Sequence, residues 1–551
     1  MSNSIMALSV VDPSTVEFGQ SVPPHGPHAI TTHFPGWRAS ERFRDRDASL
    51  FAELKSIYPR FSPFGLAATL CQSIAQKLPL PEGYGCAAFV SRDVWAENQI
   101  HAVSERRKQQ RLDASELRYH VVELAGVRLY VVGYPRAKAS AAIFQWQHGG
   151  LGFSTRLAEA LLPHMDSLIH VGEFPDGVGA PEPTFLPEGD SHRALRERIA
   201  GLMMRACPTE HEKSVGVDDV SIYPTGMGAI YRLHEAIMSL RAGPTAVFGA
   251  VFQSTYHLFN ESEGGIRHYG GATDSDVDDF ETYLEGGGKC AYVFTEFPSN
   301  PVLVSVDVVR LRRLADKHGF FLVVDDTCAS FANIDLLDVA DVVVSSLTKS
   351  FSGFADVMAG SVVLNPNTAR AYPTLKQAVS SRFHNEFFEA DAAHLLSNNE
   401  DYLARCVIHN RNATALASYF HSLSLDEASP VTQVCYPPYS PGSNHLRAFL
   451  RKPTAEYPAP GYGCLLSVEF ETVEQAAAFY DAVNFFQGPH LGAHLTISMP
   501  YNLVVFGSEN PEVHAAYGLR QQQIRISVGL EDQEVLLHRC AEAMSKVTKT
   551  T

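Results

Sequence analysis

The stretch VVVSSLTKSFSG, residues 342–353, sets a lysine directly after a short apolar run. Three consecutive valines favour a strand that is buried on both faces, as in a mostly parallel sheet. Lys349 follows where that strand should end, and open α/β sheets bind ligands at this edge. Burial lowers the pKa of a lysine amine toward neutrality, which a Schiff-base lysine requires. The hydroxyl groups of Ser346 and Thr348 could then meet a phosphate, although this short pattern also occurs around ordinary surface lysines.

A pair of aspartates ends the preceding apolar run. Asp325 and Asp326 follow FFLVV (320–324), and Thr327 comes next. A carboxylate buried at a strand end needs a partner, because an unpaired charge there costs several kcal/mol. A protonated pyridine nitrogen is such a partner, and the charge lets a cofactor ring accept electrons. We expect Asp325 to make this contact, with Asp326 as the nearest alternative and a helix N-cap as the competing structural role.

A third pattern, Thr225-Gly226-Met227-Gly228, opens a predicted helix. Small residues at a helix start let backbone N–H groups and the positive end of the helix hold a phosphate. Such a turn by itself more often serves packing. Together, a phosphate turn, a ring aspartate and a lysine, in this order and each near a predicted strand end, describe a fold-type-I domain that binds pyridoxal 5'-phosphate (PLP).

The surrounding sequence predicts an α/β protein. Apolar residues recur at helical spacing from position 193 onward, and again after the turn at 225–228. Short apolar runs alternate with these helices, namely TAVFGAV (245–251), AYVFTE (291–296), FFLVVDD (320–326), DVVVSS (341–346) and SVVL (361–364). This alternation predicts a mostly parallel sheet with helices on both faces.

The length of 551 residues predicts more than one domain. We expect an N-terminal extension and arm over 1–192 and a PLP-binding large domain over 193–385. A smaller C-terminal α/β domain over 386–551 contains the strand-like runs LLSVEFE (465–471) and QIRISVGLE (523–531).

The composition is that of a soluble globular protein and argues against several partners. The net charge of −17 disfavours nucleic acid and an anionic membrane, and no apolar run reaches the ~18 residues of a membrane span. Nine scattered cysteines without close pairs predict reduced thiols in a cytoplasmic protein. The Pro-rich segment 18–37 predicts an extended arm, whose His25, His28 and His33 lack the further ligands of a metal site, so we expect no metal.

With these residues identified, the sequence resembles the Cys/Met-metabolism PLP enzymes, and among them the fungal cystathionine γ-synthases. Motifs similar to the family's, at the family's spacing, are TEFPSNPVL (295–303), VVDDT (323–327), SSLTKSFSG (345–353) and IRISVGLE (524–531). Segments similar to the fungal branch are VPPHGPHAITTHFPGW (22–37), YPRF (58–61), VMAGSVVLNP (357–366) and GPHLGAHLTISMPYNL (488–503). The likeness therefore covers most of the chain.

The resemblance implies a role for each motif residue. Lys349 would hold the cofactor as a Schiff base, and Asp325 would contact the pyridinium nitrogen. Arg525 would clamp the substrate carboxylate, because a guanidinium fork matches a carboxylate. The remaining contacts would come from Gly226, Met227, Ser346 and Thr348 at the phosphate, Phe252 and Thr327 at the cofactor, Asn300 at the cofactor's phenolic oxygen and the substrate carboxylate, and His490 at the substrate.

Three positions depart from the family's pattern. The aromatic residue stacked on the cofactor is usually Tyr, whose hydroxyl helps to move protons, and here it is Phe252. His490 stands where the fungal motif has Ser before Leu-Gly. The family's Tyr-x-Arg, which reaches a neighbouring chain's phosphate, is not recognisable just before position 193. Tyr58 and Arg60 have this form but lie far upstream, so we assign no residue to that role.

The resemblance implies a PLP-dependent transferase that performs γ-replacement on an O-acylated homoserine, such as O-acetyl-L-homoserine. A thiol, carbon or amine nucleophile would be joined to Cγ. The alternatives are carbon–carbon bond formation with a β-keto acid in specialised metabolism, γ-elimination by a lyase, and an inactive scaffold, against which the retained Lys349, Asp325 and Arg525 argue. Active sites in this family form between chains, so we expect a homodimer or homotetramer that binds an amino-acid donor and a nucleophilic acceptor.

Overall fold

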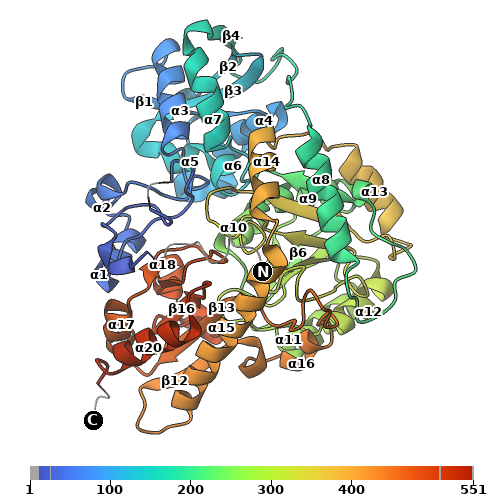
Figure 1. Ribbon diagram of the computed structural model, residues 1–551. Coiled ribbons are helices and arrows are strands. Elements are labelled where there is room, and N and C mark those ends of the chain that lie inside the picture. Colours follow the sequence, from blue (N-terminus) through green and yellow to red (C-terminus); the bar gives the residue numbers. More distant parts are fainter. Residues whose placement is uncertain (1–10, 25, 508–510, 549–551) are drawn as a thin grey trace.

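The computed structural model describes residues 11–24, 26–507 and 511–548. Three sheets organise these residues, each in its own region of the molecule (Figure 1). The largest sheet has seven strands in the order β5-β11-β10-β9-β8-β6-β7. Their bounds are β5 (Val220–Tyr223), β6 (Thr245–Phe248), β7 (Ile266–Tyr269), β8 (Tyr292–Glu296), β9 (Phe321–Asp325), β10 (Val342–Ser345) and β11 (Gly360–Leu364).

This sheet is mostly parallel, as the sequence predicts. Strands β10, β9, β8, β6 and β7 are parallel neighbours, whereas β11 pairs antiparallel with both β10 and β5. The side chains of Val342 and Val344 join the hydrophobic core on one face, and that of Val343 joins the core on the other. A run of valines is needed here because both faces of a parallel sheet are covered.

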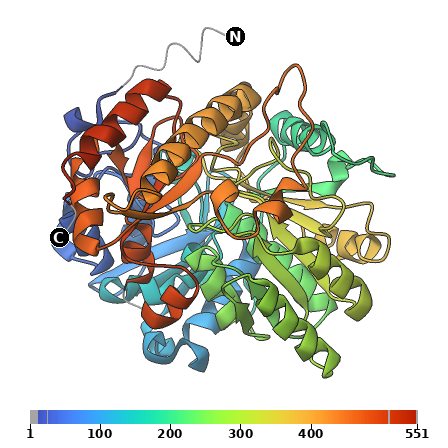
Figure 2. The same cartoon turned by 90° about the horizontal axis from the view of Figure 1, so that it is seen from below.

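Helices cover the two faces (Figures 1 and 2). Ile230 and Leu233 of α9 share a core with Val344, whereas Leu311 of α12 packs in the same core as Val343. The two helical patterns that begin at 193 and after the 225–228 turn are confirmed. The helices of this domain are α8 (Asp190–Met203), α9 (Gly226–Leu240), α10 (Gln253–Glu261), α11 (Asp274–Glu285), α12 (Val308–His318), α13 (Tyr372–Ser380) and α14 (Glu389–Asn398).

A smaller α/β domain follows, drawn in orange and red in Figure 1. Its five-stranded sheet has the order β12-β13-β16-β15-β14, and both apolar runs expected there form its central strands, β13 and β16. The strands are β12 (Val431–Cys435), β13 (Leu465–Phe470), β14 (Phe486–Gln487), β15 (Ile497–Met499) and β16 (Gln523–Ser527). The helices are α15 (Tyr402–Ser424), α16 (Ser443–Arg447), α17 (Val473–Ala482), α18 (Tyr501–Phe506), α19 (Pro511–Ala516) and α20 (Gln533–Met544).

The chain also folds a third domain upstream, which we call the N-terminal domain (residues 66–187). It contains a four-stranded antiparallel sheet of order β1-β3-β2-β4, which the sequence did not predict. Its core is continuous with one face of the seven-stranded sheet. The elements are α3 (Leu66–Lys77), β1 (Tyr84–Phe89), α4 (Arg92–Ala102), β2 (Arg118–Leu124), β3 (Val127–Pro135), α5 (Ala139–Ala142), α6 (Phe144–Gln147), α7 (Thr155–Leu161) and β4 (Ile169–Glu173).

The predicted arm runs along the C-terminal domain before two short helices, α1 (Trp37–Arg44) and α2 (Ala48–Glu53). The backbone N–H of Phe34 donates to the carbonyl oxygen of Gln487 at 3.0 Å. Of the arm histidines, His25 lies outside the described residues. The ring of His28 contacts Thr155 and Glu159, and Nδ1 of His33 accepts from the Gln487 N–H.

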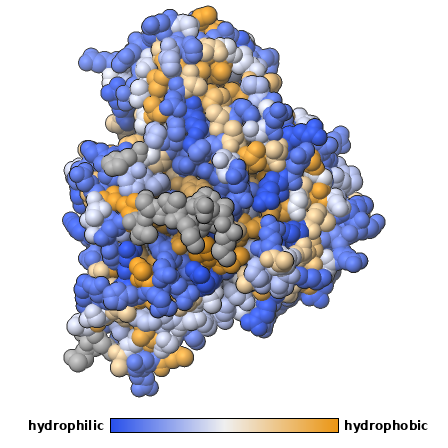
Figure 3. All heavy atoms as spheres, viewed as in Figure 1, coloured by the Kyte–Doolittle hydropathy of each residue, from blue (hydrophilic) through white to orange (hydrophobic). Residues whose placement is uncertain are grey.

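The face of the molecule in Figure 3 is largely hydrophilic, with smaller apolar areas interspersed. Among the residues that the structure describes, no helix has the length and apolar character to cross a membrane.

Candidate active site

Lys349 lies at the carboxyl edge of the large sheet, in the turn after β10. Its amine nitrogen is 5.2 Å from the centre of the Tyr58 ring. Burial, helped by the cationic side chains of Arg525 and Arg60, lowers the pKa of Lys349 to about 7. The uncharged, nucleophilic form of the amine is therefore well populated at neutral pH.

Two carboxylates lie next to each other at the same edge. Glu296 ends β8 and Asp325 ends β9, and the two residues are direct partners in the parallel ladder. Burial raises the pKa of both carboxyls, and the charge of Asp325 raises that of Glu296 further. Backbone N–H groups of Phe252 and Asn300 donate to Glu296 at 2.6 and 3.0 Å. Within the described ranges, no basic side chain forms an ion pair with either carboxylate.

The structure separates Asp325 from its rival Asp326. Successive side chains of a strand point to opposite faces. The hydroxyl of Ser345 donates to Asp326, which lines a small hollow together with Ser330 and Tyr402. The side chain of Asp325 instead accepts the backbone N–H of Thr327 at 2.9 Å. Asp325 is therefore the aspartate that faces the edge with Lys349.

The predicted phosphate turn meets the turn before the lysine. A Cβ on Gly226 would lie 2.8 Å from Oγ of Ser346, so a glycine is required where α9 starts. Thr225 caps this helix by accepting the N–H of its third residue at 2.8 Å. Oγ1 of Thr327 accepts the Ser346 N–H at 2.8 Å and so fixes the facing turn. The first N–H groups of α9 thus point to the same space as Ser346.

Two further residues of the predicted phosphate set are buried around this turn. The hydroxyl of Thr348 donates to the carbonyl oxygen of Ala359 at 3.1 Å and accepts its N–H at 3.0 Å, which ties the lysine turn to β11. Met227 lies in the first turn of α9, and its sulfur accepts the hydroxyl of Thr255 at 3.4 Å. All four predicted phosphate residues therefore lie in one region of the structure.

Arg525 of β16 reaches this site from the C-terminal domain. Its guanidinium donates to Oδ1 of Asn300 at 3.2 Å and to the carbonyl oxygen of Pro489 at 2.6 Å. The ring of Tyr501 lies 4.2 Å from the guanidinium carbon. Among the described residues Arg525 has no carboxylate partner, although it is only 3% exposed. A buried guanidinium held by neutral groups fits a carboxylate supplied by a ligand.

The structure also brings Tyr58 and Arg60 into the site, where sequence distance had left them without a role. The guanidinium carbon of Arg60 lies 5.0 Å from the Phe252 ring and 5.3 Å from the Tyr58 ring. One of its nitrogens donates to Ser254 at 3.0 Å and to the carbonyl of Gln147. Its other terminal nitrogen, Nη2, is buried and has no partner among the described residues. The pair belongs to the same chain as Lys349.

Helix α6 of the N-terminal domain and the loop after it contact this pair. The Trp146 indole donates to the carbonyl of Pro59 at 2.9 Å, between Tyr58 and Arg60. The loop continues to Gly150, whose φ of +68° favours glycine and where a Cβ would lie 2.7 Å from that of Met227. The N-terminal domain therefore contacts both the Tyr58–Arg60 segment and the phosphate turn.

These observations test whether a PLP molecule suits the residues. An uncompensated buried carboxylate pair requires a cation, and a protonated pyridine nitrogen supplies one. The unpartnered Nη2 of Arg60 and the start of α9 suit an anion, and a lysine with a pKa near 7 suits an aldehyde. The residues therefore fit the ring nitrogen, the phosphate and the aldehyde of the cofactor. Fold and site together define the class of PLP-dependent α/β enzymes.

Comparison with known proteins gives the family. The model of the "Cys/Met metabolism PLP-dependent enzyme" family matches residues 211–545, which is more than half of the chain. The chain belongs to this family, and its cofactor is PLP.

Similar proteins cover between 65% and 96% of the chain. The "Cystathionine gamma-synthase-like enzyme iboG2" of Amanita muscaria is 30% identical, over 96% of this chain and 96% of its own. The "Alanine racemase ungC" of Aspergillus violaceofuscus is 37% identical, over 76% of this chain and 73% of its own. A crystal structure of cystathionine gamma synthase from Xanthomonas oryzae pv. oryzae, with aminoacrylate and cysteine, superposes with a TM-score of 0.53 at 27% identity, covering 65% of this chain and 86% of that one.

The sequence left four residues of the site without a role, namely Tyr58, Arg60, Glu296 and Tyr501. Glu296 precedes Phe-Pro-Ser-Asn at a strand end, so the rule applied to Asp325 could have found it. Tyr501 stands in a segment noted only for its likeness to fungal relatives, and nothing local marks it as a partner of Arg525. Arg60 was seen, but its place in the site depends on the fold of a whole domain.

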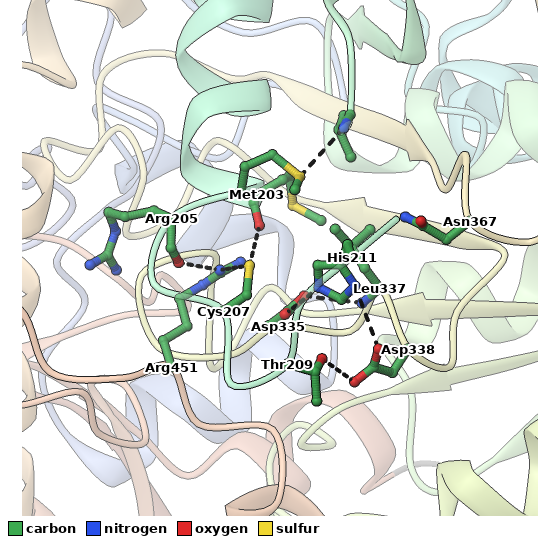
Figure 4. Close-up of polar contacts among 12 residues, drawn as sticks. Met203, Arg205, Cys207, Thr209, His211, Asp335, Leu337, Asp338, Asn367 and Arg451 are labelled. Carbon is green, nitrogen blue, oxygen red and sulfur yellow. Dashed lines mark hydrogen bonds and ion pairs between the residues drawn. The ribbon is translucent and has the colours of Figure 1, made fainter. Parts of the chain in front are cut away.

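Figure 4 shows a second polar cluster, which contains none of the site residues described above. Ligand-type atoms of Cys207, His211 and Asp335 lie within 4.8 Å of one another. The His211 ring contacts Asp335 at 2.7 Å through Nε2 and Asp338 at 3.5 Å through Nδ1. Arg451 donates to the Cys207 sulfur at 3.6 Å. Both imidazole nitrogens and the sulfur thus contact side chains of the protein itself, so we assign this cluster a structural role.

Proposed function

We propose that the protein catalyses γ-replacement on an O-acylated homoserine, with O-acetyl-L-homoserine as the preferred donor. The proposal rests mainly on the buried Arg525, which has no carboxylate partner among the described residues and lies in the same site as Lys349 and Asn300. That pairing suits an α-amino acid, whose carboxylate meets the guanidinium while its amine meets the cofactor. The cystathionine gamma-synthase names of two relatives described above, and the share of the chain that they cover, support the same reaction class.

Each site residue has one task in this proposal. Lys349 binds the cofactor covalently and, once released by substrate, moves protons on the substrate carbons. Asp325, with Glu296 beside it, keeps the cofactor's ring nitrogen protonated. The phosphate contacts come from Gly226, Met227, Ser346, Thr348 and Arg60. Thr327 orients Ser346, and Phe252 packs on the cofactor ring. Asn300 and Arg525 bind the substrate carboxylate, and His490 lies beside that carboxylate.

The cofactor, when bound, supplies an electron sink that acidifies the hydrogens on Cα and Cβ of the donor. Lys349 removes these protons because its amine is uncharged near neutral pH. Expulsion of the γ-acyloxy group then opens Cγ to a thiol, carbon or amine nucleophile. Phe252 cannot donate a proton in any of these steps, so proton traffic depends on other side chains.

A second candidate reaction is amino-acid racemisation, because a relative with 37% identity carries the name alanine racemase. Racemisation needs proton removal and return at Cα but no leaving group. γ-Elimination by a lyase and carbon–carbon bond formation with a β-keto acid use the same site residues as γ-replacement. The four reactions therefore differ in their products rather than in their cofactor chemistry.

A product analysis distinguishes them. Purified protein would be given O-acetyl-L-homoserine with cysteine, with homocysteine or with a β-keto acid, and separately L-alanine, with products read by mass spectrometry and chiral chromatography. We expect a condensed product and acetate only when an acceptor is present. Release of a 2-oxo acid and ammonia without acceptor indicates a lyase, and D-alanine indicates a racemase. A Lys349→Ala variant that kept the yellow colour of bound cofactor would refute the whole proposal.

A further inference from the structure

Tyr501 carries a buried hydroxyl group beside the arginine of the site. The residue is 3% exposed, and its hydroxyl has no hydrogen-bond partner among the described residues. The centre of its ring lies 4.2 Å from the guanidinium carbon of Arg525. Buried polar atoms are nearly always bonded, so an unpartnered one at a binding site indicates a ligand. A ligand that Arg525 binds would lie beside this phenol.

The contact with Arg525 separates Tyr501 from other tyrosines of this kind. In the described part of the chain, the hydroxyls of Tyr119, Tyr231 and Tyr480 are also buried without a partner. Tyr480, for example, packs edge-to-face on Trp37 at 6.3 Å in the core of the C-terminal domain. Of these four tyrosines, Tyr501 is the one whose ring lies against a residue proposed to bind substrate. The missing bond and the contact together point to a role in the site.

The backbone fixes Tyr501 next to Arg525. Strand β15 ends at Met499, which is the direct partner of Arg525 in the antiparallel ladder with β16. Helix α18 begins two residues later, at Tyr501. The side-chain amide of Asn502 donates to the carbonyl oxygen of Arg520 at 3.2 Å, which ties the start of the helix to the segment before β16. The phenol is therefore held in place before a ligand binds, so that little ordering opposes binding.

The surroundings keep this hydroxyl protonated. Burial raises the pKa of Tyr501 to about 12, although the positive charge of Arg525 acts to lower it. At neutral pH the side chain is therefore an uncharged O–H donor. A carboxylate oxygen accepts such a donor, and a hydrogen bond to a charged group is stronger than one between neutral groups.

We propose that Tyr501 is a substrate-binding residue whose hydroxyl donates a hydrogen bond to the α-carboxylate of the amino-acid substrate. Arg525 supplies the positive charge for that carboxylate, and Asn300, which bonds the guanidinium at 3.2 Å, lies in the same group. The phenol is a further donor on the ring side of the arginine. The inference rests on the proposed function, because its ligand is the amino-acid donor of that reaction.

A binding role and a structural role for this hydroxyl predict opposite effects of its removal. A buried hydroxyl without a partner destabilises the folded protein, because the group has lost water and gained no bond. Its removal should therefore leave the thermal midpoint unchanged or raise it, while weakening the binding of a carboxylate. A structural hydroxyl would instead lower the thermal midpoint and leave binding unchanged.

The test compares two amines that differ only in the carboxylate. Holoenzyme would be titrated with L-2-aminobutyrate, which has no γ leaving group, and with propylamine, which is the same molecule without its carboxylate. Binding would be followed by the change in cofactor absorbance. The variant is Tyr501→Phe, which keeps the ring on Arg525 and removes the hydroxyl. Tyr480→Phe is the matched control, since it removes a buried, unpartnered hydroxyl from the core of the same domain.

We expect Tyr501→Phe to keep the native cofactor content and a thermal midpoint no lower than that of the native protein. Its Kd for L-2-aminobutyrate should rise about 10- to 100-fold, whereas its Kd for propylamine should change by less than about twofold. Tyr480→Phe should change neither constant. Equal weakening for both amines, or unchanged binding of L-2-aminobutyrate, would overturn the role of Tyr501 and leave the proposed function intact. A native protein without preference for L-2-aminobutyrate over propylamine would overturn the carboxylate site, and with it the proposed function.

Discussion

Mixing two inactive variants tests whether Arg60 completes the site of its own chain. In the structure its guanidinium lies 5.0 Å from the ring of Phe252 and bonds Ser254 at 3.0 Å, all within the chain that carries Lys349. We would combine Lys349→Ala chains with Arg60→Met chains, which lack the free Nη2 donor. A hydrogen bond to a charged group contributes about 1.5–3 kcal/mol, so Arg60→Met should bind cofactor ~10- to 100-fold more weakly.

The expected recovery follows from counting sites. If Arg60 acted across an interface, about half of the randomly formed dimers would contain one chain of each variant. Each mixed dimer would have one intact site of its two, so the mixture would show about a quarter of the native activity. If it acts within its chain, every site lacks either the lysine or the arginine, and the mixture stays as inactive as its components. The chains would be co-expressed with different tags and assayed at a cofactor concentration just sufficient for the native protein. Arg38→Met, at an 80% exposed side chain, is the matched control. Recovery near a quarter would refute the same-chain arrangement.

Three further outcomes follow from the site. Arg525→Gln removes a positive charge that holds the pKa of Lys349 near 7, so the pH midpoint of cofactor uptake by apoprotein should rise by about one unit; an unchanged midpoint contradicts this. Asp325→Asn should lower turnover by ~100-fold or more, because a charge facing the cofactor ring is lost. Asp326→Asn should lower turnover by less than about tenfold, because Asp326 bonds Ser345 and its charge does not face the ring. Gly150→Ala should lower the thermal midpoint clearly more than Gly179→Ala, since both have positive φ but only Gly150 faces close neighbours; equal shifts would show that the close approach is unimportant.

The large domain was predictable because its signals are local and repeated. Strands β6, β8, β9, β10 and β11 are short, largely buried apolar runs, and Lys349 and Asp325 stand at strand ends, since Lys349 follows Val342–Val344 and Asp325 ends β9. Strands β5 and β7, which are more polar, were not marked by such a run. Parallel strands bring their carboxyl ends to one edge whatever the length of the connecting helices. Residues far apart in the sequence could therefore be placed together without coordinates.

The N-terminal domain gave weaker signals. Strand β4 (Ile169–Glu173) is exposed along most of its length, so its apolar residues do not mark a core. Strands β1, β2 and β3 carry long buried stretches without the regular alternation that identifies an antiparallel strand. The sheet exists because its core joins that of the large domain, which is a tertiary effect.

The position of Tyr58 and Arg60 explains why the resemblance was incomplete. The N-terminal domain lies in the sequence between this pair and helix α8, where the family's Tyr-x-Arg is expected just ahead. That domain is anchored at two points, through Trp146 to Pro59 at 2.9 Å and through Leu186 to Asn385 at 3.3 Å. An inserted domain held in this way lengthens the chain without displacing the flanking motif. Within the described residues, Tyr58 and Arg60 thus reach the site of Lys349 from the same chain.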